Sequence, residues 1–177
     1  MLEDKLLIWK FNRGDTRILG RIYEKYKNDL MTLATALLYN KTDAEDVIHD
    51  IFSGFVNSCG KLTVKGNLKG YLAACVANNI RNRTKSAQTY QQFELESIPD
   101  ANQPELSVIF GEESQRLALA LSKLPYEQRE TVLLHLFMDI KFKAIASLQN
   151  VSANTAAGRY RYGLDKLRTL LNDEVKK

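Results

Sequence analysis

Residues that cross-link a chain or ligate metals are scarce in this sequence. Its 177 residues include two cysteines and two histidines, and neither Cys59 nor Cys75 belongs to a cluster with metal-ligand spacing. Both cysteines lie in apolar helical segments, so we expect them to be reduced thiols in the protein core. The scarcity excludes a disulfide framework, and we expect neither a metal nor a cofactor.

Long apolar runs are missing as well. The amino-terminal segment, MLEDKLLIWKF, lacks the uninterrupted apolar core of a signal peptide, and no stretch reaches the length needed to cross a bilayer. The sequence therefore predicts a cytoplasmic protein that is not inserted in a membrane.

The alternation of apolar and polar residues that is typical of β-strands is almost absent, and proline occurs at only three positions. We therefore predict an all-α fold. Its first two helices should span residues 2–12 and 16–39, separated by Gly14-Asp15. The second helix should face inward with Leu19, Ile22, Tyr23, Tyr26, Leu30, Leu33 and Leu37.

Acidic residues are concentrated in the middle of the chain. Residues 86–115 hold six acidic side chains and no basic one, whereas basic side chains outnumber acidic ones on either side. Helical periodicity also fades there, as expected of a linker. We therefore predict two small helical domains, residues 1–87 and 113–177, joined by a linker over residues 88–112.

The segment near the C-terminus has the pattern of a helix-turn-helix. A short apolar helix from Phe142 to Gln149 precedes Ser152, whose hydroxyl can cap a second helix. The outer face of that second helix is small, polar and basic, and such a face can enter the major groove of DNA. A helical hairpin with a solvated basic face is the alternative. The inward stripe is Ala156, Tyr160, Gly163, Leu167 and Leu171, and the outward one is Asn154, Ala157, Gly158 and Arg161, flanked by Arg159 and Lys166.

The most regular amphipathic helix begins near Thr42, which has the spacing of a capping box with Glu45. A histidine beside carboxylates on its exposed side suggests acid–base chemistry, but no nucleophile accompanies it, and we expect no enzymatic activity. A merely solvated face is the alternative to a binding surface. The exposed side carries Asp46, His49, Asp50 and Ser53.

A basic loop, KLTVKG, precedes another amphipathic helix, NLKGYLAACVANNIRNRTK. Amide and guanidinium groups line one side of this helix, which suits contacts with nucleotides, although a solvated surface helix would look similar. This polar stripe contains Asn78, Arg81, Asn82 and Lys85.

Four segments in order resemble the small bacterial RNA polymerase sigma factors of the extracytoplasmic-function type, in the sigma-70 family. They are YEKYKNDLMTLATALLYNKTDAEDVIHDIF, YLAACVANNIRNR, LSKLPYEQRETVLLHLF and IKFKAIASLQNVSANTAAGRYRYGLDKLR. The resemblance implies an alternative sigma factor that directs polymerase core to specific promoters. Its N-terminal domain would grip the polymerase clamp and melt the −10 element, and its C-terminal domain would bind the −35 element and the polymerase flap. RNA polymerase core and promoter DNA are the implied partners, and an anti-sigma factor is left open as a third.

The resemblance also assigns three surfaces. The polymerase-binding residues would be Asp46, His49, Asp50 and Ser53, with His49 where the family usually has Gln. The −10 element would meet Lys65, Asn67, Lys69, Tyr71, Asn78, Asn79, Arg81, Asn82 and Lys85, with Asn78 where a flipped base is read and Tyr71 where the family commonly has Trp. The −35 element would meet Ser152, Asn154, Thr155, Gly158, Arg159, Arg161 and Lys166. Ala157 and Gly158 replace the usual basic and hydroxyl residues, so the −35 sequence does not follow.

Three other functions compete with this interpretation. A helix-turn-helix regulator with an N-terminal sensor or partner-binding domain shares most of these features, and initiation with core polymerase alone would separate the two. An enzyme would rest only on His49 with Asp46 and Asp50. A helical adaptor would leave two basic helices unexplained.

Overall fold

The computed structural model describes residues 2–64, 67–90 and 115–175, and every regular element within these ranges is helical, which confirms the all-α prediction. Residues 91–114, which include most of the predicted linker and the six acidic side chains of residues 86–115, lie outside the described residues. The elements are α1 (Leu2–Asn12), α2 (Thr16–Leu38), α3 (Lys41–Asn57), α4 (Leu68–Tyr90), a helix over residues 115–122, α6 (Tyr126–Val132), the π-helical segment η1 (Leu133–Phe137), α7 (Phe142–Gln149) and α8 (Ala153–Val175).

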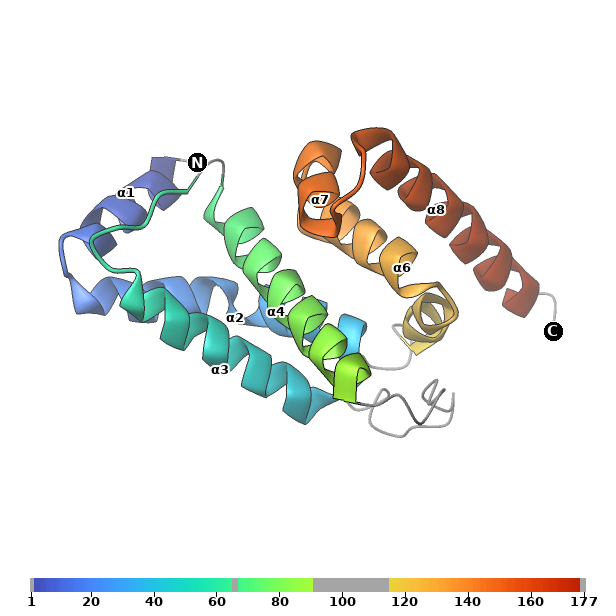
Figure 1. Cartoon of the computed structure of the whole chain (residues 1–177), viewed down its shortest axis with the longest axis horizontal. Coiled ribbons are helices and arrows are strands. Elements are labelled where there is room, and N and C mark those ends of the chain that lie inside the picture. The colour runs from blue at the N-terminus through green and yellow to red at the C-terminus, as the bar shows by residue number, and fades with distance from the viewer. Residues whose placement is uncertain (1, 65–66, 91–114, 176–177) are drawn as a thin grey trace.

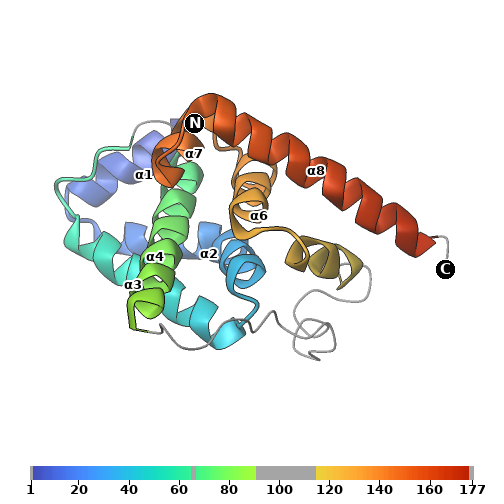
Figure 2. The same ribbon diagram turned by 45° about the vertical axis from the view of Figure 1, so that its right-hand side comes forward.

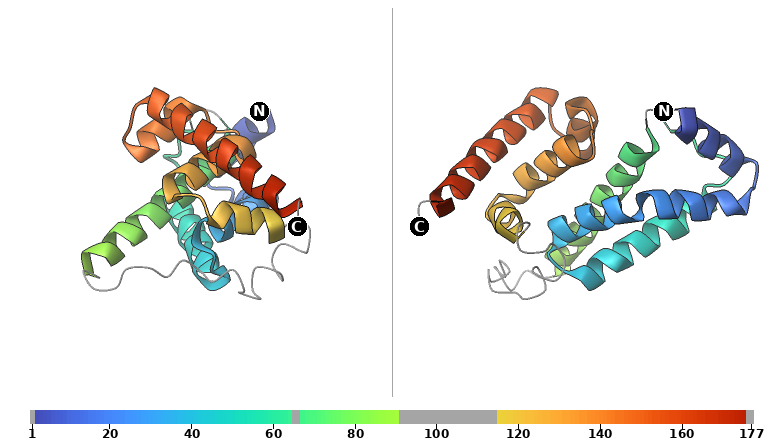
Figure 3. Two further views of the ribbon diagram at one scale, coloured as in Figure 1. Left: turned by 90° about the vertical axis from the view of Figure 1, so that its right-hand side faces the viewer. Right: turned by 180° about the vertical axis from the view of Figure 1, so that it is seen from behind.

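The helices form two groups that meet along α4. Helices α1 to α4 lie together, and α6 and α7 lie beside α4, with α8 on the side of α6 and α7 that faces away from the first group (Figure 1, Figure 2). The view from behind shows the same order (Figure 3). Contacts of α2 with α6, and of α4 with α7 and η1, join the groups. None of the described helices is long and apolar enough to span a membrane.

Helix α2 is the centre of the first group, because it packs against α1, α3 and α4. Its N-terminus is capped by Asp15, whose carboxylate accepts a hydrogen bond from the backbone N–H of Arg17, as the Gly14-Asp15 break predicts. The predicted inward side is confirmed by the fully buried Ile22 and Leu30. Tyr23 is an exception, since it is 39% exposed where its ring meets the edge of Phe52 on α3.

The predicted cap of α3 is wrong by two residues. Tyr39 adopts a left-handed conformation that ends α2, and the side chain of Asn40 then accepts the backbone N–H of Asp43 at 3.0 Å. The helix therefore starts at Lys41, and Thr42 lies inside its first turn. Asn40 directly follows the left-handed Tyr39 and is itself a favoured N-cap residue, so it caps the helix two residues before Thr42 could do so.

The thiols also differ from the prediction. Cys59 is exposed, because it lies in the turn after α3, where its thiol contacts the carbonyl oxygen of Phe11 at 3.0 Å. Cys75 is partly buried on α4, and burial raises the pKa of its thiol.

The π-helical segment η1 changes which side chains face inward after α6. Continued α-helical periodicity predicts Leu136 and Phe137 inside, but they are 66% and 38% exposed. The backbone N–H of Met138 bonds to the carbonyl of Leu133, five residues back, so each side chain in this turn is rotated relative to an α-helix. Met138 is fully buried instead.

The helix-turn-helix is present as predicted. Helix α7 ends at Asn150 in a left-handed conformation, and the Ser152 hydroxyl accepts the backbone N–H of Thr155 at 3.0 Å at the start of α8. Ala156 and Leu167 are buried. Gly163 lets α8 approach α6 closely, since a Cβ at that position would lie 2.9 Å from Cγ2 of Val132.

Candidate nucleic-acid interface

The outward face of α8 presents the side chains that the sequence assigned to the −35 element. Asn154 and Arg161 are exposed, and the space around Gly158 is open, with no atom within 4 Å of a Cβ built there. Open space beside a glycine allows the helix backbone to come close to a DNA groove. Ser152, Thr155 and Lys166 are exposed on the same helix or at its cap.

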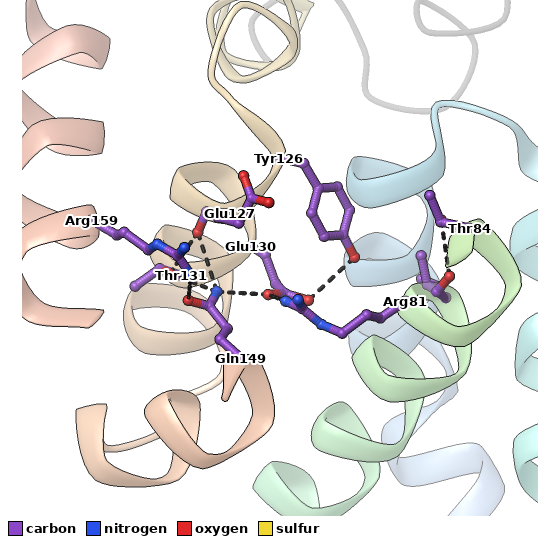
Figure 4. Close-up of polar contacts among 9 residues, drawn as sticks. Arg81, Thr84, Tyr126, Glu127, Glu130, Thr131, Gln149 and Arg159 are labelled. Atoms are coloured by element: carbon purple, nitrogen blue, oxygen red, sulfur yellow. Dashed lines mark hydrogen bonds and ion pairs between the residues drawn. The ribbon is translucent and has the colours of Figure 1, made fainter. Parts of the chain in front are cut away.

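Arg159 is held differently from Arg161. Its guanidinium group donates a hydrogen bond to the side-chain carbonyl of Gln149 at 2.6 Å, so it is oriented by the preceding helix (Figure 4). The Gln149 amide in turn donates to the carboxylate of Glu130 at 2.6 Å and to the Thr131 hydroxyl at 2.9 Å. Gln149 is buried, so the orientation of Arg159 is fixed from inside the protein.

Glu130 is the most buried member of this group and has no exposed surface. Burial raises the pKa of its carboxyl, opposed by the nearby charge of Arg81 and by hydrogen bonds from Gln149, Tyr126 and Arg81. Arg81 reaches it from α4 and forms an ion pair with it (Figure 4). The carboxylate of Glu130 is thus the point where α4, α6 and α7 meet.

The polar stripe of α4 is divided by this contact. Asn78 and Asn82 are exposed, but Arg81 points inward and only 15% of its side-chain surface is accessible. Asn79 is partly buried, and its Oδ1 has no hydrogen-bond partner. Of the predicted −10 residues of this helix whose side chains the structure describes, Asn78 and Asn82 are therefore the freely accessible ones.

The start of α4 holds the other residues assigned to the −10 element. Lys69 pairs with Asp29 on α2 at 2.8 Å, and the Asn67 side chain accepts the backbone N–H of Gly70 at the first turn. Tyr71 is partly buried. Lys65, and the side chain of Lys85, lie outside what the structure describes.

The acidic face of α3 is accessible as predicted, since Asp46, His49, Asp50 and Ser53 are all exposed. Asp50 pairs with Arg83 of α4, a residue that the sequence had not assigned to any site. Next to this face, a groove of about 540 Å³ runs between α2 and α3. Its lining includes His49 and Ser53 together with the apolar side chains of Leu19, Tyr23, Ile48, Phe52 and Val56.

Comparison with known families decides the identity. Residues 22–89 match the model of sigma-70 region 2, and residues 114–167 match that of sigma-70 region 4, so the two models together cover more than half of the chain. The chain belongs to the sigma-70 family. It is a sigma factor of the extracytoplasmic-function type that directs RNA polymerase to promoters, and its partners are RNA polymerase and promoter DNA.

Three curated sigma factors are similar over much of the chain. The RNA polymerase sigma-H factor of Bacillus subtilis is 28% identical over 67% of this chain and 53% of its own length. The sigma-H factor of Pseudomonas aeruginosa is 21% identical over 97% of both chains. The extracytoplasmic-function sigma factor SigW of B. subtilis is 23% identical over 96% of this chain and 97% of its own. This sigma factor thus spans about half of the first relative and nearly all of the other two.

Two solved structures share the fold of this sigma factor. The sigma factor RpoE from Bartonella quintana, in complex with the anti-sigma factor NepR, aligns with a TM-score of 0.60 at 22% identity, over 81% of this chain and 89% of that one. CnrH, in complex with the cytosolic domain of CnrY, aligns with a TM-score of 0.67 at 20% identity, over 96% and 97%.

Several residues that stand out in the structure of this sigma factor were not predicted from its sequence. Glu130 and Gln149 lie in segments that look like ordinary helix, and their only signal is a polar residue on an otherwise apolar side. Tyr162 is 70% exposed on the outer side of α8, where an aromatic side chain had no assigned role.

Proposed function

We propose that this sigma factor reads a −35 element with α8 and a −10 element with α4, and that it contacts polymerase through the exposed face of α3. The observation that carries the proposal is the open outer face of α8, with Asn154 and Arg161 exposed around Gly158. In this proposal residues 1–87 form the polymerase and −10 domain, residues 113–177 form the −35 domain, and residues 88–112 connect them.

At the −10 element, Asn78 is the residue best placed to read an unstacked base. Its amide is exposed on α4 and can hydrogen-bond a base edge that is already paired in an intact duplex. Melting would then be driven by binding alone, since each captured base contributes on the order of 1–3 kcal/mol. We therefore propose that the protein carries out no chemical step of its own.

At the polymerase, the α3 face combines charge with an apolar groove. Asp46 and Asp50 repel DNA phosphates but can meet basic residues of a protein surface. The adjoining groove, with Tyr23, Phe52 and Val56 in its lining, can receive an apolar side chain from the same partner. This division of charges favours polymerase at α3 and DNA at α4 and α8. Because both of these partners are in the cytoplasm, we propose that the protein acts there.

An anti-sigma factor is a further proposed partner. Two proteins of the same fold were solved with such partners, NepR and the cytosolic domain of CnrY. This chain has an apolar groove of about 340 Å³ at the contact between the two groups of helices, which suits the apolar side of a partner helix. The groove is lined by Thr32, Ala36, Tyr39, Leu117, Ala118, Leu121, Val132, Leu133, Leu136, Phe137 and Leu167.

The test is transcription with purified core polymerase. Transcript 5′ ends from genomic fragments would give the promoter, and Asn78→Ala would then be compared with Asn57→Ala, an exposed asparagine on α3 outside the assigned surfaces. We expect Asn78→Ala alone to reduce permanganate reactivity of the melted strand while binding of the −35 duplex is unchanged. No initiation by the wild-type protein, or equal losses in both variants, would contradict the proposal.

A further inference from the structure

Two arginines that the proposed function assigns to different promoter elements are tied to each other in this structure. Arg81 of α4 pairs with Glu130, Glu130 accepts a hydrogen bond from Gln149, and Gln149 accepts one from Arg159 of α8 (Figure 4). We call these four residues the Glu130 cluster. It links the first group of helices to the recognition helix through side chains that are largely withdrawn from solvent.

The cluster is incompatible with simultaneous binding of the two elements. Three successive hydrogen-bond-length contacts join the guanidinium groups of Arg81 and Arg159, which places them no more than roughly 10 Å apart. Elements centred at −35 and −10 are about 25 base pairs apart, or about 85 Å of B-form DNA at about 3.4 Å per pair. The domains must therefore separate before both helices can reach their elements.

A neighbouring residue supports the same closed arrangement. Arg129, next to Glu130 on α6, donates a hydrogen bond to the carbonyl oxygen of Leu37 at 3.1 Å, in the last turn of α2. Its guanidinium group also lies over the ring of Tyr39, 4.7 Å from the ring centre. A cation that satisfies a free carbonyl at a helix C-terminus is favoured there. Adjacent residues of α6 thus bind two different helices of the first group.

We propose that the Glu130 cluster is a self-inhibitory lock: in the free protein it buries Arg81 and holds α8 too close to α4 for promoter binding. This inference rests on the proposed roles of α4 and α8. The lock is electrostatic, because Glu130 has no exposed surface and Arg81 is its cationic partner. Opening removes Arg81 from Glu130 and leaves the carboxylate with amide and hydroxyl partners only, which favours the closed state until a partner captures the separated domains.

The first test measures domain separation without DNA or polymerase. Spin labels at Asn57→Cys on α3 and Asn172→Cys on α8, both exposed, would be placed in a Cys59→Ser, Cys75→Ala background. Glu130→Gln keeps the shape of the side chain but removes the charge, and we expect it to raise the open population about tenfold or more in double electron–electron resonance. Glu127→Gln, which removes the same charge one turn earlier on α6, should leave the distance distribution unchanged.

Arg81→Gln provides a second variant that breaks the same ion pair from the other side, because Arg81 lies on α4 and Glu130 on α6. Any local damage to the fold would then fall in a different group of helices. Because both substitutions break one ion pair, the double variant should open the protein no further than either single one. Unchanged distances in both single variants, or fully additive opening in the double variant, would overturn the lock. That result would leave the proposed function intact, since the proposed function is tested by transcription and not by distance.

The second test asks whether the lock is inhibitory. Apparent affinity for a promoter duplex that spans both elements scales with the binding-competent fraction, so Glu130→Gln should raise it by the factor by which the open population rises. Glu127→Gln, which removes the same charge, should match the wild type. If Glu130→Gln opens the protein but leaves the affinity for this duplex unchanged, the cluster is structural and the proposal fails.

Discussion

Two glycines of α8 allow one substitution to be tested in opposite environments. Alanine at either position removes the backbone freedom of glycine and should stabilise the helix by about 1 kcal/mol. At Gly158 nothing lies within 4 Å of the new methyl group, so the full gain is expected. At Gly163 the methyl would lie 2.9 Å from Cγ2 of Val132, a buried β-branched side chain with one strongly preferred rotamer in a helix. Overpacking of this kind costs about 1–3 kcal/mol.

The helical gain is common to both variants, so their difference isolates the contact with Val132. We expect Gly158→Ala to be more stable than Gly163→Ala by about 1–3 kcal/mol in urea unfolding followed by far-ultraviolet circular dichroism. Gly158→Ala should nevertheless weaken binding to a −35 duplex, because its methyl group faces the DNA. Equal stability of the two variants would refute the close approach of α8 to α6.

Three further predictions concern charged side chains. Reversing Asp46 and Asp50 to Lys should abolish binding to core polymerase in a pull-down, while the isolated C-terminal domain still binds duplex DNA; unchanged core binding would remove the α3 assignment. Arg161→Ala should reduce the free energy of binding to the −35 duplex by roughly 1–3 kcal/mol and relax the preference at one or two base pairs. Arg159→Ala should instead weaken binding to all duplex sequences alike and lower the slope of log affinity against log salt concentration by about one. Titrations of base-substituted duplexes at several salt concentrations would show the reverse if α8 is rotated in the groove. Asp4 of α1 is buried and accepts hydrogen bonds from the Tyr26 hydroxyl at 2.6 Å and the Leu68 backbone N–H at 3.2 Å, so Asp4→Asn should destabilise the fold at neutral pH by about 1–3 kcal/mol. Burial acts to raise the pKa of Asp4, but hydrogen bonds to its carboxylate outweigh burial and lower it, so this stability is present above the unfolded pKa of about 3.9 and is lost as pH falls through the folded pKa. The free energies of unfolding of wild type and variant should therefore differ at pH 7 and converge at acid pH. A difference that stays constant between the two pH values would contradict the assignment.

Local signals account for the parts of the fold that the sequence predicted well. Helix α7 has the predicted bounds, α2 starts after Gly14-Asp15, and Ser152 caps α8 as predicted, because such break and cap residues act on the few residues beside them; α2 ends one residue early, at the left-handed Tyr39. A prediction from periodicity assumes about 3.6 residues per turn throughout a helix. The π-helical turn at η1 departs from this value, and Leu136 therefore points outward.

Non-local contacts explain the rest. The acidic face of α3 and the outer face of α8 were predicted because each lies on one helix, and exposure of such a face follows from the burial of its opposite side. Glu130 could not be predicted in the same way. Its partners Arg81 and Gln149 lie 49 and 19 residues away in the sequence. The helical pattern around Glu130 carries no information about which of the distant polar side chains will pair with it.

Arg81 shows what this means for experiments on the −10 surface. In sequence it belongs with Asn78 and Asn82, but in the fold it also closes the Glu130 cluster. Replacing Arg81 therefore removes a proposed DNA contact and the lock together, and the two losses have opposite effects on promoter binding. A small net effect would not show that Arg81 is unimportant. Glu130→Gln releases the lock while Arg81 stays in place, so adding Arg81→Gln to that variant measures the DNA contact alone.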